Sequence, residues 1–149
     1  MFALLKKKNV VTDVKLEASD EISLLKVVAQ KAASKLSLDG QEIKSGLFAS
    51  AAAGTNQIVA NRVLLTHAST ESIKDVQFVI LTLSDAIYWN GDVNQPVDYV
   101  VVTVMPAAAD TPYDDVAQKI SSVITANAGQ LSDWHDNAGQ LNQLLGQFK

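Results

Sequence analysis

The sequence contains no cysteine, and this absence excludes disulfide cross-links and thiolate metal sites. An uncrosslinked domain suits a reducing compartment, so the sequence predicts a cytoplasmic protein. Histidine is also scarce. The two that are present, His67 and His135, are too few for a zinc site built from several imidazoles. No glycine-rich phosphate loop is found either, because Gly54-Thr55-Asn56 lacks the second glycine and the lysine. We therefore expect neither a metal nor another cofactor.

Positive charge and long apolar runs are limited as well. The chain has a single arginine, Arg62, and a formal net charge of −4, which argues against a nucleic-acid partner. The most apolar run, Val97 to Met105, is about half as long as a bilayer-spanning helix, so we expect no membrane insertion. At the N-terminus, Phe2 to Leu5 precede the lysines, the reverse of the order in a secretory signal, and we expect no targeting segment.

The composition is that of an ordinary globular protein. Of the 149 residues, 48% are hydrophobic and 19% are charged, which is too apolar for a disordered chain. This length matches the usual size of one domain with one core. The sequence therefore predicts a single domain over residues 1–149.

Helical and strand patterns alternate along the chain. Apolar residues at three- and four-residue spacing, preceded by the capping residues Ser19-Asp20, predict a helix over 21–36. Short β-branched runs predict strands, and Asn90-Gly91 predicts a turn before the most apolar strand. The expected order is strand 10–16, helices 21–36 and 41–53, strands 58–66, 76–83 and 97–105, a helix beginning near Pro112, and a helical segment over 131–148, possibly broken at Gly139. Interleaved helices and strands favour an α/β layered fold.

The best candidate for chemistry is His67. It follows the apolar run Val63 to Thr66, so it should emerge at the edge of a sheet, where catalytic side chains are common. A neutral imidazole attacks phosphorus through one ring nitrogen when a hydrogen bond to the other nitrogen fixes its tautomer. The alternative is a structural histidine that binds a carbonyl group. His135, beside Trp134 on the last helical segment, is interpreted as a solvated surface residue.

Three segments carry a family resemblance. Val63-Leu64-Leu65-Thr66-His67, Ile87-Tyr88-Trp89-Asn90, and Gln95 to Val100 with Pro106 beyond it resemble the enzyme IIA domains of the mannitol–fructose type in the bacterial sugar phosphotransferase system, a family that includes the nitrogen-regulatory IIA proteins. The resemblance extends more faintly over nearly the whole chain. It implies a mixed sheet covered by helices, with His67 as the phosphorylated residue.

The chain departs from the family pattern near this histidine, as a divergent member would. Thr66 replaces a proline, and Tyr113, followed by Asp114 and Asp115, stands where the family has a second histidine. A tyrosine offers a phosphoryl group only a neutral hydroxyl, whereas the helix N-terminus at Thr111-Pro112-Tyr113 still offers backbone N–H groups. Tyr113, Thr66 and Arg62 are therefore the candidates for phosphate stabilisation, although Arg62 needs a bend in the strand to reach His67.

Two hypotheses follow from the resemblance. In the first, the chain is a phosphocarrier, a phosphotransferase component in which His67 accepts a phosphoryl group from the histidine-containing phosphocarrier protein and passes it to an enzyme IIB component. In the second, it is a divergent regulatory or protein-binding module with the same fold and little or no transfer. The residues leave open which sugar is involved, the oligomeric state, and whether the role is in transport or regulation.

Overall fold

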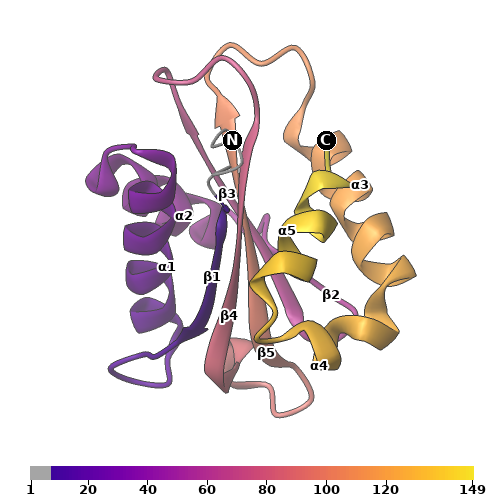
Figure 1. The fold of residues 1–149 in the computed structure, drawn as a ribbon. Helices are drawn as coiled ribbons and strands as arrows, with labels where there is room; N and C mark the ends of the chain where they lie inside the picture. Colours follow the sequence, from indigo (N-terminus) through magenta and orange to yellow (C-terminus); the bar gives the residue numbers. More distant parts are fainter. Residues whose placement is uncertain (1–7) are drawn as a thin grey trace.

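The computed structural model describes residues 8–149, so the predicted absence of a targeting segment before Lys8 concerns residues outside this range. Figure 1 shows three layers: a central β-sheet between two groups of helices. The α/β fold class predicted from the sequence is confirmed. None of the helices within residues 8–149 has both the length and the apolar character that a bilayer crossing requires.

The sheet is mixed, with five strands in the order β1-β4-β5-β3-β2. β1 is parallel to β4 and β3 is parallel to β5, whereas β4 and β5 are antiparallel, as are β2 and β3. β5 lies at the centre of the sheet, and its residues 97 and 99–106 are buried, as its continuous apolar pattern predicts. The strands are β1 (Val10–Val14), β2 (Gln57–Val59), β3 (Val63–Thr70), β4 (Gln77–Tyr88) and β5 (Pro96–Pro106).

The helices cover both faces of the sheet. α1 (Glu21–Leu36) and α2 (Gly40–Ala52) pack on one face, and α3 (Tyr113–Ala126), α4 (Leu131–Trp134) and α5 (Ala138–Gly146) pack on the other (Figure 1). Short 3-10 turns are present at Trp89–Gly91 and Ala128–Gln130. The carboxylates of Asp20 and Asp39 accept hydrogen bonds from the first turns of α1 and α2, which explains where these helices begin. Each helical group therefore has its own apolar core against the sheet.

One predicted strand is divided in two. The sequence predicts a strand over 58–66, but Ala60 and Asn61 have φ angles of +55° and +58° and turn the chain back on itself. The result is an antiparallel hairpin of β2 and β3, closed by a hydrogen bond from the Arg62 amide to the Val59 carbonyl. Asparagine tolerates this left-handed conformation, but alanine rarely adopts it, so the apolar pattern alone could not locate the turn.

Strand β3 directs alternate side chains to the two helical layers. Leu64 and Ala68 belong to the core beneath α1 and α2, and Val63 and Leu65 belong to the core beneath α3–α5. Because the side-chain period of a strand is two residues, His67 faces α3–α5 and Thr66 faces α2. α2 lies close to β3: a Cβ atom built on Gly46 would lie 2.5 Å from the Cβ of Ala68.

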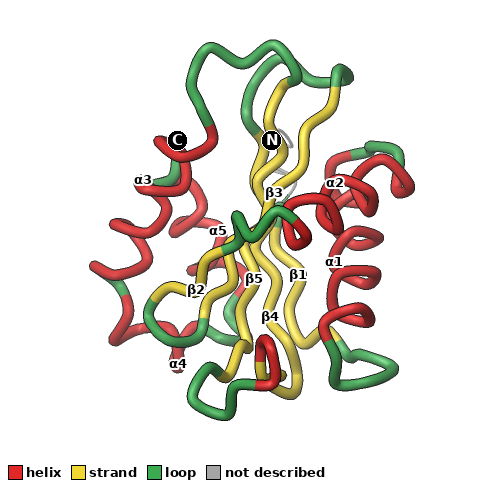
Figure 2. The backbone as a smooth tube through the Cα atoms, turned by 180° about the vertical axis from the view of Figure 1, so that it is seen from behind, coloured by secondary structure: helices red, strands yellow, loops and turns green. Residues whose placement is uncertain are grey.

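Both edges of the sheet are short. β2 has three residues, and β1 has five, with a register shift between Val11 and Val14. At this shift Asp13 has a φ of +57°, and its amide donates a 2.9 Å hydrogen bond to the hydroxyl of Thr82. The loops that follow β3 and β5 lie together at one end of the sheet (Figure 2).

Candidate functional site

His67 is half-buried on β3 and packs against the start of α3. Its ring stacks on that of Tyr113, the first residue of α3, with ring centroids 3.7 Å apart and an interplanar angle of 21°. Tyr113 belongs to the first turn of a helix, where backbone N–H groups lack intrahelical partners and the helix dipole is positive. The two residues that the sequence aligned with the family histidines are therefore in direct contact.

Thr55 holds the ring from the other direction. Its Oγ1 lies 2.9 Å from Nε2 of His67 and also donates a 3.0 Å hydrogen bond to the carbonyl oxygen of Ser50. The Thr55 amide donates to the same carbonyl, which belongs to the last turn of α2. The loop after α2 thus uses Thr55 both to satisfy a free helix carbonyl and to bind His67.

A polar network continues behind Thr55 on the α2 face of β3. The Ser50 hydroxyl lies 3.0 Å from the Leu47 carbonyl, 3.1 Å from Oδ1 of Asn56 and 3.2 Å from the hydroxyl of Thr66. The Thr66 side chain is fully buried there. The structure therefore does not bring Thr66 to the exposed side of the His67 ring, because neighbouring strand residues point to opposite faces.

Burial keeps the site electrically neutral near pH 7. Loss of solvent lowers the pKa of His67, and the negative charge of Asp114 opposes this effect only partly. Burial, with a smaller contribution from Asp114, raises the pKa of Tyr113 to about 12. His67 is therefore a neutral imidazole with a free lone pair, and Tyr113 is a neutral phenol that can donate a hydrogen bond.

Two hydroxyl groups near His67 lack partners. The Tyr113 hydroxyl and Oγ1 of Thr103 are enclosed and make no hydrogen bond within residues 8–149. Thr103 is the β5 partner of His67 in the parallel β3–β5 register, so both side chains point toward α3–α5. An enclosed hydroxyl without a partner is costly, and each of these donors is available to an incoming acceptor.

Arg62 is held elsewhere. Its guanidinium binds both carboxylate oxygens of Asp98, with Nε to Oδ1 at 2.9 Å and Nη2 to Oδ2 at 2.5 Å, and Nη1 donates to Ser132. Five residues of extended chain separate it from His67, roughly 16 Å at the usual rise of a strand. The structure therefore does not bring Arg62 to the site, because its salt bridge fixes it near the start of β3.

The second histidine is less exposed than the sequence suggested. His135 packs edge-on against Tyr99, with ring centroids 5.3 Å apart, and its Nε2 lies 3.6 Å from Oδ2 of Asp98. Its side chain is 21% exposed, so it is not a fully solvated surface residue. Within residues 8–149 no group of three or more His, Asp or Glu side chains is arranged to hold a metal ion.

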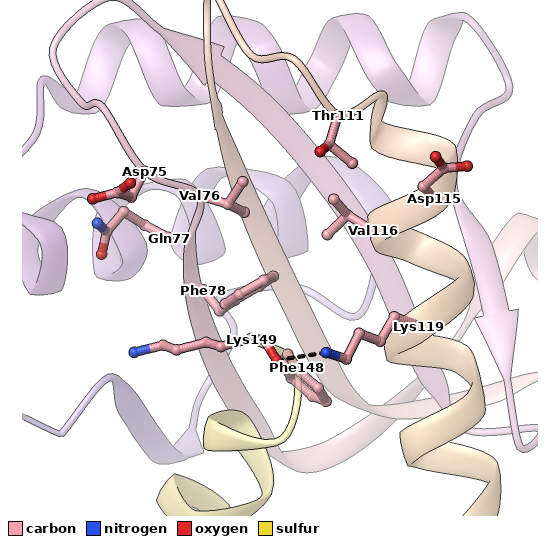
Figure 3. Close-up of a pocket in the computed structure, with 10 residues that line it drawn as sticks. All are labelled: Asp75, Val76, Gln77, Phe78, Thr111, Asp115, Val116, Lys119, Phe148 and Lys149. Carbon is pink, nitrogen blue, oxygen red and sulfur yellow. Dashed lines mark hydrogen bonds between the residues drawn. The ribbon is translucent and has the colours of Figure 1, made fainter.

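A separate pocket of about 650 Å³ opens on the same face of the sheet (Figure 3). It lies between the start of β4, α3 and the end of the chain, and its lining residues are Asp75, Val76, Gln77, Phe78, Thr111, Asp115, Val116, Lys119, Phe148 and Lys149. Phe78 pairs with Thr103, which in turn pairs with His67, so the pocket is two strands away from the histidine. It contains no histidine, and the candidate chemistry remains at the His67–Tyr113 contact.

Sequence reasoning missed Thr55 and Thr103. Gly54-Thr55-Asn56 was considered only as a failed phosphate loop, although a hydroxyl residue just after a helix is well placed to cap it. Thr103 was recognised only as a polar residue that interrupts an apolar strand. A polar residue within a buried strand is itself a signal, because it needs a partner that the sequence does not supply.

Comparison with protein families gives one match. Residues 3–141 match the family described as the phosphoenolpyruvate-dependent sugar phosphotransferase system, EIIA 2. A search of curated protein sequences finds no significant match.

Solved structures share the fold. Nitrogen regulatory protein IIA-Ntr from Neisseria meningitidis is similar with a TM-score of 0.71 and 14% identity, covering 94% of each chain. A protein assigned as PTS IIA (PtxA) from Streptococcus mutans has a TM-score of 0.66 and 13% identity, covering 98% of this chain and 91% of its own. A PTS IIA domain from Streptococcus pyogenes M1 GAS has a TM-score of 0.62 and 10% identity, covering 98% and 94%. At these identities the similarity establishes the fold.

Proposed function

The chain belongs to the phosphoenolpyruvate-dependent sugar phosphotransferase system EIIA 2 family, and on this premise we propose that it is a phosphocarrier that accepts a phosphoryl group on His67. The observation that carries the proposal is the position of His67 between Thr55 and Tyr113. One neighbour binds a ring nitrogen and the other stacks on the ring face, so the imidazole is oriented before a donor arrives. Burial also lowers its pKa, which favours the nucleophilic neutral form.

The proposed reaction requires two protein partners and no cofactor. The histidine-containing phosphocarrier protein is the donor, and an enzyme IIB component is the acceptor, both in the cytoplasm. In the first transfer a bond forms between a His67 nitrogen and phosphorus, and the donor's phosphorus–nitrogen bond breaks, with its electron pair returning to the donor histidine. The docked donor would exclude water from the shallow site.

Among the candidates for phosphate stabilisation, the geometry favours Tyr113. Its phenol touches the His67 ring and has an unused donor, and its place at the start of α3 adds backbone N–H groups. Thr103 supplies a second unused hydroxyl on the same face. For Thr66 and Arg62 we propose only indirect roles: Thr66 supports the Ser50 network, and Arg62 fixes the start of β3 through Asp98.

A second function, a regulatory or protein-binding module without transfer, is favoured by one specific feature. Asp114 lies close enough to His67 to influence its pKa, and a carboxylate near a phosphoryl group repels it. Within residues 8–149 no lysine or arginine side chain is hydrogen-bonded to the His67 ring to offset this charge. The balance between Asp114 and the donors of Tyr113 and Thr103 decides between the two functions.

Intact-mass measurement tests the proposal. The purified chain is incubated with phosphoenolpyruvate, enzyme I and the histidine-containing phosphocarrier protein. We expect one phosphoryl group on the wild type and on His135→Gln, which removes the other histidine, and none on His67→Gln. A wild-type chain that stays unmodified while an ordinary enzyme IIA is fully labelled would refute phosphoryl transfer from these donors and leave the regulatory module as the function.

A further inference from the structure

We propose that Thr55 is a positioning residue that fixes the tautomer of His67 and makes Nδ1 the atom that attacks phosphorus. This inference rests on the proposed phosphocarrier function, and it adds the identity of the reacting atom. It is carried by the two hydrogen bonds of the Thr55 hydroxyl, one to His67 and one to the carbonyl of Ser50.

The location of the protons follows from these bonds. A carbonyl oxygen has no proton, so the 3.0 Å contact between Thr55 Oγ1 and the Ser50 oxygen requires the threonine to donate its only hydroxyl proton. The 2.9 Å contact with His67 then requires Nε2 to be the donor and Thr55 to be the acceptor. A neutral imidazole that carries its proton on Nε2 has its free lone pair on Nδ1.

The surroundings of the two ring nitrogens agree with this assignment. Nε2 points into the loop at the C-terminal end of α2, where the helix dipole is negative and favours an N–H donor. Nδ1 makes no hydrogen bond within residues 8–149 and is not one of the enclosed atoms without a partner. It is therefore the ring nitrogen that an incoming phosphorus atom can reach.

The transfer step balances with Thr55 in this role. The Nδ1 lone pair forms the new bond to phosphorus while the bond from phosphorus to the donor nitrogen breaks, and the donor nitrogen keeps the electron pair. The Nε2 proton stays in place, so the phosphorylated ring is cationic and its N–H donates to Thr55, whose hydroxyl donates to Ser50. A charge-assisted hydrogen bond is stronger than a neutral one, so Thr55 stabilises the phosphorylated ring more than the free ring.

Nitrogen NMR tests the tautomer without any phosphoryl donor. In long-range ¹H–¹⁵N correlation spectra of the His135→Gln variant, His67 is the only histidine, and we expect a protonated Nε2 and an unprotonated Nδ1. Thr55→Val should bring the Nδ1-protonated form into exchange, whereas Thr55→Ser, which keeps the hydroxyl, should retain the wild-type pattern. A wild-type ring protonated on Nδ1 overturns the proposal.

The phosphorylated atom is tested with potassium phosphoramidate, a small donor that loses ammonia and needs no protein partner. We expect Nδ1-phosphohistidine at His67 in the wild type and in Thr55→Ser, identified by ³¹P and ¹⁵N NMR. In Thr55→Val the Nδ1 rate should fall about five- to tenfold, with Nε2 product appearing. Nε2-phosphohistidine as the wild-type product overturns the inference. Labelling by phosphoramidate but not by the protein donors would instead refute the proposed function and leave the Nδ1 assignment standing.

Discussion

Adding a single methyl group at Gly46 should destabilise the strand that carries His67. In Gly46→Ala the new Cβ would lie 2.5 Å from the Cβ of Ala68 and 3.1 Å from its Cα, whereas carbon atoms in contact prefer about 3.5–4.0 Å. α2 and β3 must therefore separate by about 1 Å. Overpacking of this kind costs about 1–3 kcal/mol, and the better helix propensity of alanine returns roughly 0.5–1 kcal/mol. We expect a net loss of about 1–2 kcal/mol.

Thermal and urea denaturation measure this loss. For a domain of this size the melting temperature should fall by about 3–6 °C. Gly40→Ala in the same helix is the matched control, since nothing lies within 4 Å of its Cβ, and it should be neutral or slightly stabilising. Adding Ala68→Gly to Gly46→Ala should recover about 1 kcal/mol in a double-mutant cycle. A Gly46→Ala protein as stable as the wild type would show that the two elements are not in close contact.

Three further predictions concern polar groups. Tyr113→Phe removes a hydroxyl without a partner and should raise the free energy of unfolding by about 0.5–1 kcal/mol in urea, whereas Tyr99→Phe, which breaks a 2.6 Å hydrogen bond to a backbone carbonyl, should lower it by about 1 kcal/mol; a shared sign would contradict the hydrogen-bond assignments. His67 has a lowered pKa when folded, so its contribution to stability is present above pH 6.5 and lost as the pH falls through the folded pKa; unfolding in urea between pH 5 and 7.5 should show this slope in the wild type and a weaker one in His67→Gln. Asp98→Asn weakens the two-point contact with Arg62 and should cost about 1–2 kcal/mol in the same assay, and a neutral result would assign the contact to the solvent-exposed class.

Much of the fold could be predicted from local signals. The helix over 21–36 was predicted with the bounds that α1 has, because a capping aspartate and a regular apolar face act together there. The central strand was predicted within one residue at each end, because a continuous apolar run suits a position covered on both faces. The hairpin at Ala60 and Asn61 was not predicted, since left-handed alanine has no sequence signal.

The site could be predicted only in part, for a related reason. His67 and Tyr113 were selected from the sequence, and the structure brings their rings together. The contacts that fix the details are long-range: Thr55 meets His67 across a helix end, and Arg62 meets a carboxylate 36 residues away. Periodicity reports which face a residue occupies, but it does not report which hydroxyl or carboxylate will lie opposite.

The irregular outer strands of the sheet also bear on self-association. Long, flat edge strands with free N–H and C=O groups template pairing between molecules, and aggregation-prone segments are typically six or seven residues long. β2 offers three residues before the turn at Ala60 and Asn61, and β1 is interrupted at Asp13. The two longest and most apolar strands, β4 and β5, are paired on both sides. Within the described chain, the segments most able to form cross-β fibrils are thus withheld from other molecules until the domain unfolds.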